Sequence, residues 1–242
     1  RMLPFHLTTP SEVELRITPH YEPSQVPYHG SSRVDVNTTS RGTMRYTGAQ
    51  FVLEIGTRGG LTSGDLTYQA NFEQILGGLR LALAHHLLHT SRGILLHASA
   101  AKVGELVHCF PGPSGTRDRN SIVTAPGSIL ADQSVARVLT VHGVTAWGTP
   151  FGNRLPPSAT PGERVALHRI IKAPDNSLCP LSMREQLSLI LGAMVFLTDT
   201  NQLGHEVLQI ITSVLARAVT VDALRCTADG RFWREVFPKE FQ

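Results

Sequence analysis

The stretch FPGPSGTRDRNS, at residues 110–121, constrains the fold of this chain more than any other part of it. It follows the apolar segment LVHCF at residues 106–110, which indicates a buried strand. A glycine-rich turn after such a strand is typical of a phosphate-binding loop, in which backbone N–H groups turn inward on the phosphates. The stretch therefore has the sequence context of a phosphate-binding loop.

The loop departs from the full phosphate-loop pattern where its charged groups should stand. Arg117, Asp118 and Arg119 occupy the positions of Gly, Lys and Ser or Thr. A shift of two residues brings Arg119 to the lysine position but requires an insertion. Pro126 and Gly127 prevent the long helix that should follow the loop. Taken alone, GPSG favours an ordinary turn. The candidate cofactor-binding residues are Gly112, Pro113, Ser114, Gly115, Thr116, Arg117, Arg119 and Ser121.

The rest of the chain predicts a mixture of strands and peripheral helices. Strands rich in β-branched and aromatic residues are expected at 13–17, 33–37, 43–47, 50–55, 93–101 and 106–110. A helix is expected from Phe72, with apolar residues on one face, to near residue 90. Two more helices are expected at 181–198 and 203–218, then a strand at 218–224 and a terminal helix at 230–237. This order predicts an α/β or α+β domain with a mixed sheet.

Composition excludes several classes of protein. Of the 242 residues, 41% are hydrophobic and 17% charged, which is typical of a folded globule. The net charge is +3 with scattered arginines, so no nucleic-acid surface is expected. No apolar run reaches the length of a membrane span, and no signal peptide is expected. Three cysteines without a CxxC pair argue against a disulfide framework and predict a cytoplasmic protein.

Four segments carry a resemblance to a known family. They are RGILLHASAAKVGELVHCFPGPSG, ILADQSVARV, WGTPFGNR and TVDALRCTADGRFWREV, in that order along the chain. The chain resembles the HPr kinase family over roughly residues 70–237, and more closely the HPr-kinase-related proteins of peptide-modification clusters. The resemblance implies the C-terminal fold of HPr kinase, which is related to phosphoenolpyruvate carboxykinase. It implies a domain at 70–242, and residues 1–69 are expected to form a β-rich region packed on it.

The resemblance also implies roles for individual residues. His97 matches a family histidine on the strand before the loop, and Asp132 matches the first of two acids that bind Mg²⁺ and take the proton from the substrate serine. Gln133 stands at the second acidic position and cannot act as a base at neutral pH. His97 and Asp132 are therefore the candidate catalytic residues, and Asp132 the candidate metal ligand.

Two functions follow from these residues. In the first, the protein is a divergent ATP-dependent kinase that uses Mg²⁺ and phosphorylates a Ser or Thr hydroxyl on a small protein or peptide. In the second, catalysis is lost and the protein is a non-catalytic binding or assembly subunit that recognises a peptide or protein partner. The missing lysine and second acid favour the second function, with weak or absent nucleotide binding. By resemblance, a homo-oligomer is expected.

Two other motifs point to other chemistries. His85 and His89, in HHLLH, lie four residues apart, which is zinc-ligand spacing on a helix. Without a third ligand or an HExxH arrangement, a solvated or partly packed face is favoured. Ser114 in GPSGT resembles a G-x-S-x-G nucleophile, but the last glycine is Thr116 and no triad is assigned, so a turn is favoured.

Overall fold

The computed structural model describes residues 14–21, 34–40, 42–48, 51–59, 61–69, 72–90, 93–112, 125–131, 134–140, 143–151, 161–195, 201–227 and 229–238. The chain divides into two compact units. The first consists of residues 1–91 and 198–201, and the second of residues 92–197 and 202–242.

The first unit contains a five-stranded sheet. Its strands are β1 (Glu14–Tyr21), β2 (Asp35–Thr38), β3 (Met44–Thr47), β4 (Phe51–Arg58) and β5 (Leu61–Tyr68), in the order β1-β5-β4-β3-β2. β1 runs parallel to β5, and the other neighbours are antiparallel. The sheet is therefore mixed.

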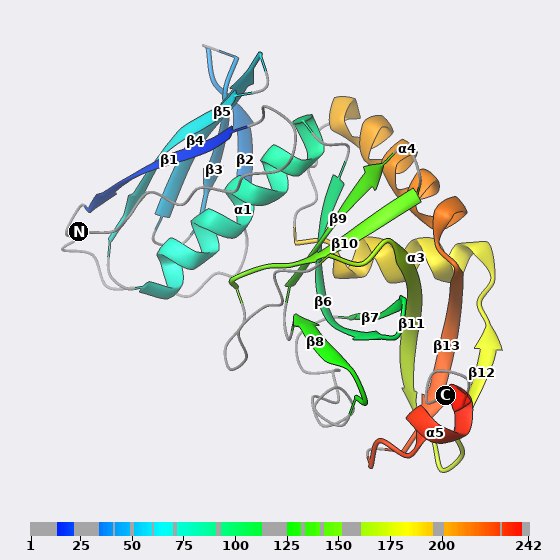
Figure 1. Cartoon of the computed structure of the whole chain (residues 1–242). Helices are drawn as coiled ribbons and strands as arrows, with labels where there is room; N and C mark the ends of the chain where they lie inside the picture. The colour runs from blue at the N-terminus through cyan, green and yellow to red at the C-terminus, as the bar shows by residue number, and fades with distance from the viewer. Residues whose placement is uncertain are drawn as a thin grey trace. The chain divides into compact units, whose positions relative to one another are not determined.

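Helix α1 (Phe72–Thr90) packs on one face of this sheet (Figure 1). The face beneath it buries Tyr46, Leu53 and Leu66, which are aligned across three strands. The opposite face is polar, and Arg45 and Glu54 form an ion pair across β3 and β4 at 2.9 Å. The alternation of apolar and polar residues along each strand explains why only one face is covered.

The second unit contains an eight-stranded sheet. Its strands are β6 (Gly93–Val103), β7 (Leu106–Pro111), β8 (Ser128–Ala131), β9 (Ser134–Thr140), β10 (Gly143–Gly148), β11 (Arg164–Lys172), β12 (Ser177–Pro180) and β13 (Thr220–Cys226). The order is β10-β9-β6-β7-β11-β13-β12, and β8 pairs with β6 beside this path. β7, β11 and β13 are mutually parallel neighbours, whereas β6–β7, β6–β9 and β12–β13 are antiparallel pairs.

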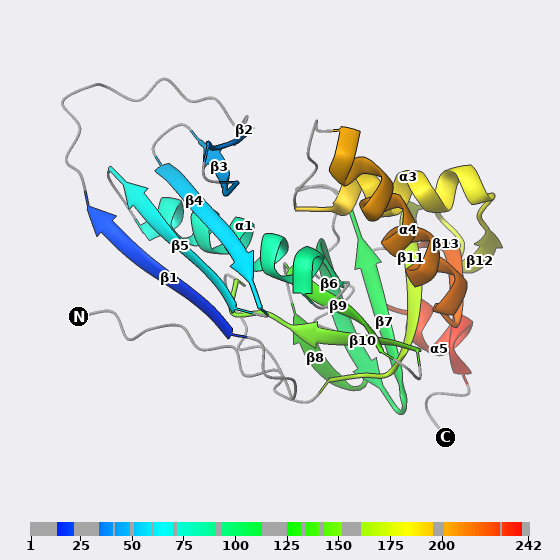
Figure 2. The same cartoon turned by 90° about the horizontal axis from the view of Figure 1, so that it is seen from above.

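Helices lie on both sides of the second sheet (Figure 2). α3 (Met183–Ala193) and α4 (Asn201–Arg217) are on one side, and α3 buries Leu189, Ile190 and Ala193. The short helix α5 (Phe232–Val236) is on the other side, where Phe232 and Trp233 pack with Phe110 and Leu224 in one apolar core. This arrangement gives the unit a layered α/β core.

The expected elements are confirmed with shifted ends. The α/β class with mixed sheets is confirmed, and so are the helix from Phe72 and the strand and helix at the end of the chain. The helix expected at 181–198 ends at Ala193, because Met194 forms a bridge with Leu96 on β6. β5 and the strands β8 to β12 were not among those expected from the sequence.

The division of the chain differs from the expected one. The expected boundary lies between residues 69 and 70, before α1, whereas the compact units divide after α1, at residue 91. α1 makes its contacts with β1, β4 and β5, because its apolar face is buried against that sheet. Among the helices that the structure describes, none is both long and apolar enough to cross a membrane.

Candidate functional site

The neighbours of β6 change on both of its edges near His97. On one edge, β9 pairs with Gly93–His97 and β8 pairs with Ala100–Lys102. On the other edge, β7 pairs with Ala98–Val103, and residues 194–195 pair with Leu95 and Leu96. His97 therefore lies at a point where the strand order changes on both sides.

The first glycine of the phosphate-like loop lies directly beside this histidine. Gly112 follows β7, and its N–H donates to the carbonyl oxygen of His97 at 3.1 Å. His97 is half-buried and Gly112 is buried. The loop therefore starts opposite His97, one pair beyond the end of the β6–β7 ladder.

Most of the loop and the candidate metal ligand lie outside the described residues. These are Pro113, Ser114, Gly115, Thr116, Arg117, Arg119, Ser121 and Asp132, together with Gln133. The described residues that flank Asp132 and Gln133 both pair with β6: Ala131 with Ala100, and Ser134 with His97. Ala131 and Ser134, which flank Asp132 and Gln133, therefore pair with the same part of β6 as Gly112 does.

The strand ends around His97 are uncharged. Residues 95–101, 109–112, 128–131 and 194–195 contain no Asp, Glu, Lys or Arg. A triphosphate requires cations for its oxygens, and Mg²⁺ requires carboxylates or other oxygen ligands. Within the described part of this site, no charged side chain meets either need.

A second pair of histidines lies in the core of the same unit. His108 on β7 and His168 on β11 are buried, with Nδ1 of His108 3.0 Å from Nε2 of His168. Trp233 and Phe237 contact their rings from the α5 side. Burial lowers the pKa of His108 to about 4, and burial together with the neighbouring His108 lowers the pKa of His168 to about 3. Both rings are neutral at pH 7, so they are core residues. Sequence reasoning missed this pair because 60 residues separate its members.

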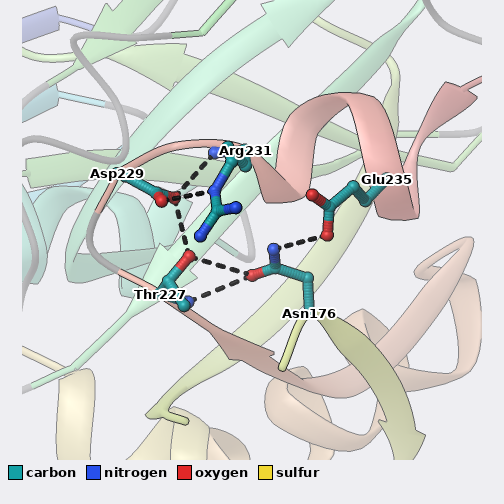
Figure 3. A network of polar contacts seen from close by, with 5 residues as sticks. All are labelled: Asn176, Thr227, Asp229, Arg231 and Glu235. Carbon is teal, nitrogen blue, oxygen red and sulfur yellow. Dashed lines mark hydrogen bonds and ion pairs between the residues drawn. The ribbon is translucent and has the colours of Figure 1, made fainter. Parts of the chain in front are cut away.

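A polar network lies after the carboxyl ends of β11 and β13 (Figure 3). Asn176 donates to Glu235 at 2.7 Å and accepts from the N–H of Thr227 at 3.0 Å. Asp229 accepts from the Thr227 hydroxyl at 2.6 Å and from the N–H of Arg231 at 3.1 Å. These bonds lower the pKa of Asp229 to about 2, the Thr227 bond most strongly. The network joins the two strand ends to α5, which makes it a structural connection.

The histidines of α1 are packed against the first sheet. Nδ1 of His85 lies 2.9 Å from the Tyr46 hydroxyl, and Nδ1 of His86 lies 2.9 Å from the Thr62 hydroxyl. His85 and His86 are buried whereas His89 is exposed, so the face that carries HHLLH is packed only in part. Burial lowers the pKa of His85 to about 3, with smaller effects from His89 and His86.

The chain was compared with known proteins. Neither the search of protein families nor the search of curated proteins finds a match. The arguments for function therefore depend on the residues and on the geometry around His97.

Proposed function

We propose that the second unit is an HPr-kinase-like module with a degraded nucleotide site, and that it binds a small protein or peptide without transferring phosphate. The proposed binding site lies around His97, where the neighbours of β6 change. Its likeness to HPr kinase and to phosphoenolpyruvate carboxykinase depends on the four ordered sequence segments. The module acts as a binding or assembly subunit.

One observation carries the proposal: the Gly112 N–H donates to the His97 carbonyl at 3.1 Å. This bond continues the β6–β7 ladder by one pair beyond Ala98 with Pro111, so the pairing of the two strands accounts for it. It places the start of the glycine turn opposite His97, where the neighbours of β6 change. That position, together with the four ordered sequence segments, supports an origin in a ligand site.

The chemistry of the same site argues against phosphoryl transfer. Transfer depends on positioning and on neutralising the charge of the moving group. The described strand ends are uncharged, and Gln133 stands where the second acid is required. Arg119 differs from lysine in its planar, bidentate group and is no simple replacement in a tight loop. The described strand ends around His97 therefore suit a peptide better than a triphosphate.

The first test measures nucleotide binding by thermal shift of the full chain with Mg·ATP. A ligand at 100 times its dissociation constant adds about 2.7 kcal/mol to stability. We expect no shift at millimolar Mg·ATP relative to Mg²⁺ alone. A shift that Arg119→Ala and Asp132→Asn both remove would establish the alternative, a divergent Ser/Thr kinase, and would overturn the proposal.

The second test measures peptide binding. Peptides selected from a random display library against the full chain are titrated into the wild type and His97→Ala. We expect at least a tenfold loss of affinity for His97→Ala, and none for His205→Ala, because His205 is an exposed histidine on α4. Equal affinities of the wild type and His97→Ala would remove His97 from the site.

A further inference from the structure

The last turn of α1 places two imidazole rings side by side. His85 and His89 are four residues apart, so they share one face of the helix. Their ring centroids are 4.3 Å apart, with an angle of 47° between the rings. Two histidines in this arrangement can offer one nitrogen each to a shared ion.

His85 is held in place by a hydrogen bond of the type found behind metal ligands. Its Nδ1 lies 2.9 Å from the hydroxyl of Tyr46, a fully buried residue of β3. The two rings also meet edge to face, at 6.0 Å and 82°. A metal-binding histidine commonly has its second nitrogen held by such a partner, which sets the tautomer and the ring orientation. When Nδ1–H donates to Tyr46, Nε2 carries the lone pair.

The neighbouring His86 has a different role. It is buried on another face of the helix, where its Nδ1 lies 2.9 Å from Thr62 Oγ1. The Thr62 hydroxyl also lies 2.9 Å from that of Thr57. This contact fixes the helix against β5 and thereby the position of His85 and His89.

We propose that His85 and His89 bind a divalent transition-metal ion such as Zn²⁺, Ni²⁺ or Cu²⁺. Imidazole nitrogen suits these ions, whereas Mg²⁺ and Ca²⁺ prefer oxygen. In the described part of the chain, no group of three or more His, Cys, Asp or Glu residues could hold a metal ion. With His85 and His89 as its ligands from the described residues, the ion would complete its coordination with water. This site is independent of the nucleotide question at His97.

The test is titration of the full chain with NiCl₂ and ZnCl₂, with MgCl₂ as the comparison. We expect Ni²⁺ and Zn²⁺ to bind and Mg²⁺ not to bind. His89→Ala should weaken binding at least tenfold without unfolding the protein, because His89 is exposed. His205→Ala, which alters another exposed histidine, should bind as the wild type does.

Two further measurements separate this site from general binding to surface histidines. Tyr46→Phe keeps the aromatic ring and removes the hydrogen bond, so metal affinity should fall about tenfold. The EPR spectrum of bound Cu²⁺ should show nitrogen ligation that changes in His89→Ala. The proposal fails if His89→Ala binds Ni²⁺ like the wild type, or if His205→Ala loses as much affinity as His89→Ala.

Discussion

His108 and His168 form a buried polar contact that depends on both rings staying neutral. One nitrogen of the pair donates and the other accepts, over 3.0 Å. Nδ1 of His168 has no hydrogen-bond partner among the described residues, so a proton added there would be buried without compensation. The rings of Phe110, Trp233 and Phe237 contact the pair, and both histidines are fully buried.

Acid should therefore destabilise the second unit through this pair. The pKa of each histidine is about 6.5 when unfolded, and about 4 and 3 when folded. Below pH 6.5 the unfolded chain binds protons that the folded chain does not, down to about pH 4 for His108 and about pH 3 for His168. The free energy of unfolding should thus fall as the pH is lowered through these windows, by up to about 1.4 kcal/mol per pH unit for each histidine, and level off below about pH 3. Urea unfolding at a series of pH values measures the slope.

The control removes both titrating groups at once. Replacing both partners of a buried polar pair with apolar groups can be nearly neutral, so His108→Leu/His168→Leu should fold and show a shallower slope in the same window. Fluorescence in a Trp147→Phe background follows the unfolding at Trp233, which contacts His108. An unchanged slope in the double variant would contradict the assignment.

Asn176 joins the turn after β11 to both β13 and α5 (Figure 3). Asn176→Asp keeps the acceptor for the Thr227 N–H but replaces the donor to Glu235 with a negative oxygen. Repulsion between the two carboxylates should therefore loosen α5, and added salt should lessen the effect. Hydrogen exchange of the α5 amides measures it.

The variant Asn176→Ala serves as the control for the negative charge that Asn176→Asp adds. Asn176→Ala loses both hydrogen bonds and adds no repulsion, so its exchange in α5 should be slower than that of Asn176→Asp at low salt. Equal exchange in the two variants would show that Glu235 has no part in holding α5.

At the scale of elements, helix α1 approaches the first sheet closely at one of two consecutive glycines. A Cβ at Gly78 would lie 2.3 Å from Cδ1 of Leu66, a fully buried side chain. A Cβ at Gly77 would meet only Phe51, at an ordinary 3.7 Å. The absence of a side chain at Gly78 thus sets the distance between the helix and β5.

Alanine substitution at these two positions should have opposite effects. Gly77→Ala should stabilise the first unit by about 0.5–1 kcal/mol, because alanine is the better helix former. Gly78→Ala should destabilise it by about 1–3 kcal/mol, because Leu66 must move in a packed core. Chemical denaturation followed by far-UV circular dichroism measures both, and a stabilising Gly78→Ala would contradict the packing described for α1.

At the scale of the whole molecule, each unit has its own buried core. The first unit buries Tyr46, Leu53 and Leu66 beneath α1, and the second buries Phe110 and Trp233 with their neighbours. Both tryptophans of the chain, Trp147 and Trp233, belong to the second unit. Tryptophan fluorescence therefore reports on one unit alone.

Gly78→Ala should consequently separate two unfolding signals. Because each unit buries its own apolar surface, hydrogen exchange of amides in α1 and β4 should accelerate, while the midpoint of the tryptophan transition stays unchanged. An equal shift of both signals would show that the two units unfold together.

The sequence by itself determined the elements of local origin. Neighbouring residues set the apolar period of α1, the strands around GPSG and the order of the final strand and helix. The types of these elements could therefore be predicted, and only their ends differ. Only the folded chain brings distant residues together, such as His108 with His168 and His85 with Tyr46. The end of α3 at Ala193 was also decided there, by the bridge between Met194 and Leu96. These contacts join residues that are far apart in the sequence and lie on different elements, and no local propensity encodes them. The physical reason is that pairing and burial are selected by the free energy of the whole core.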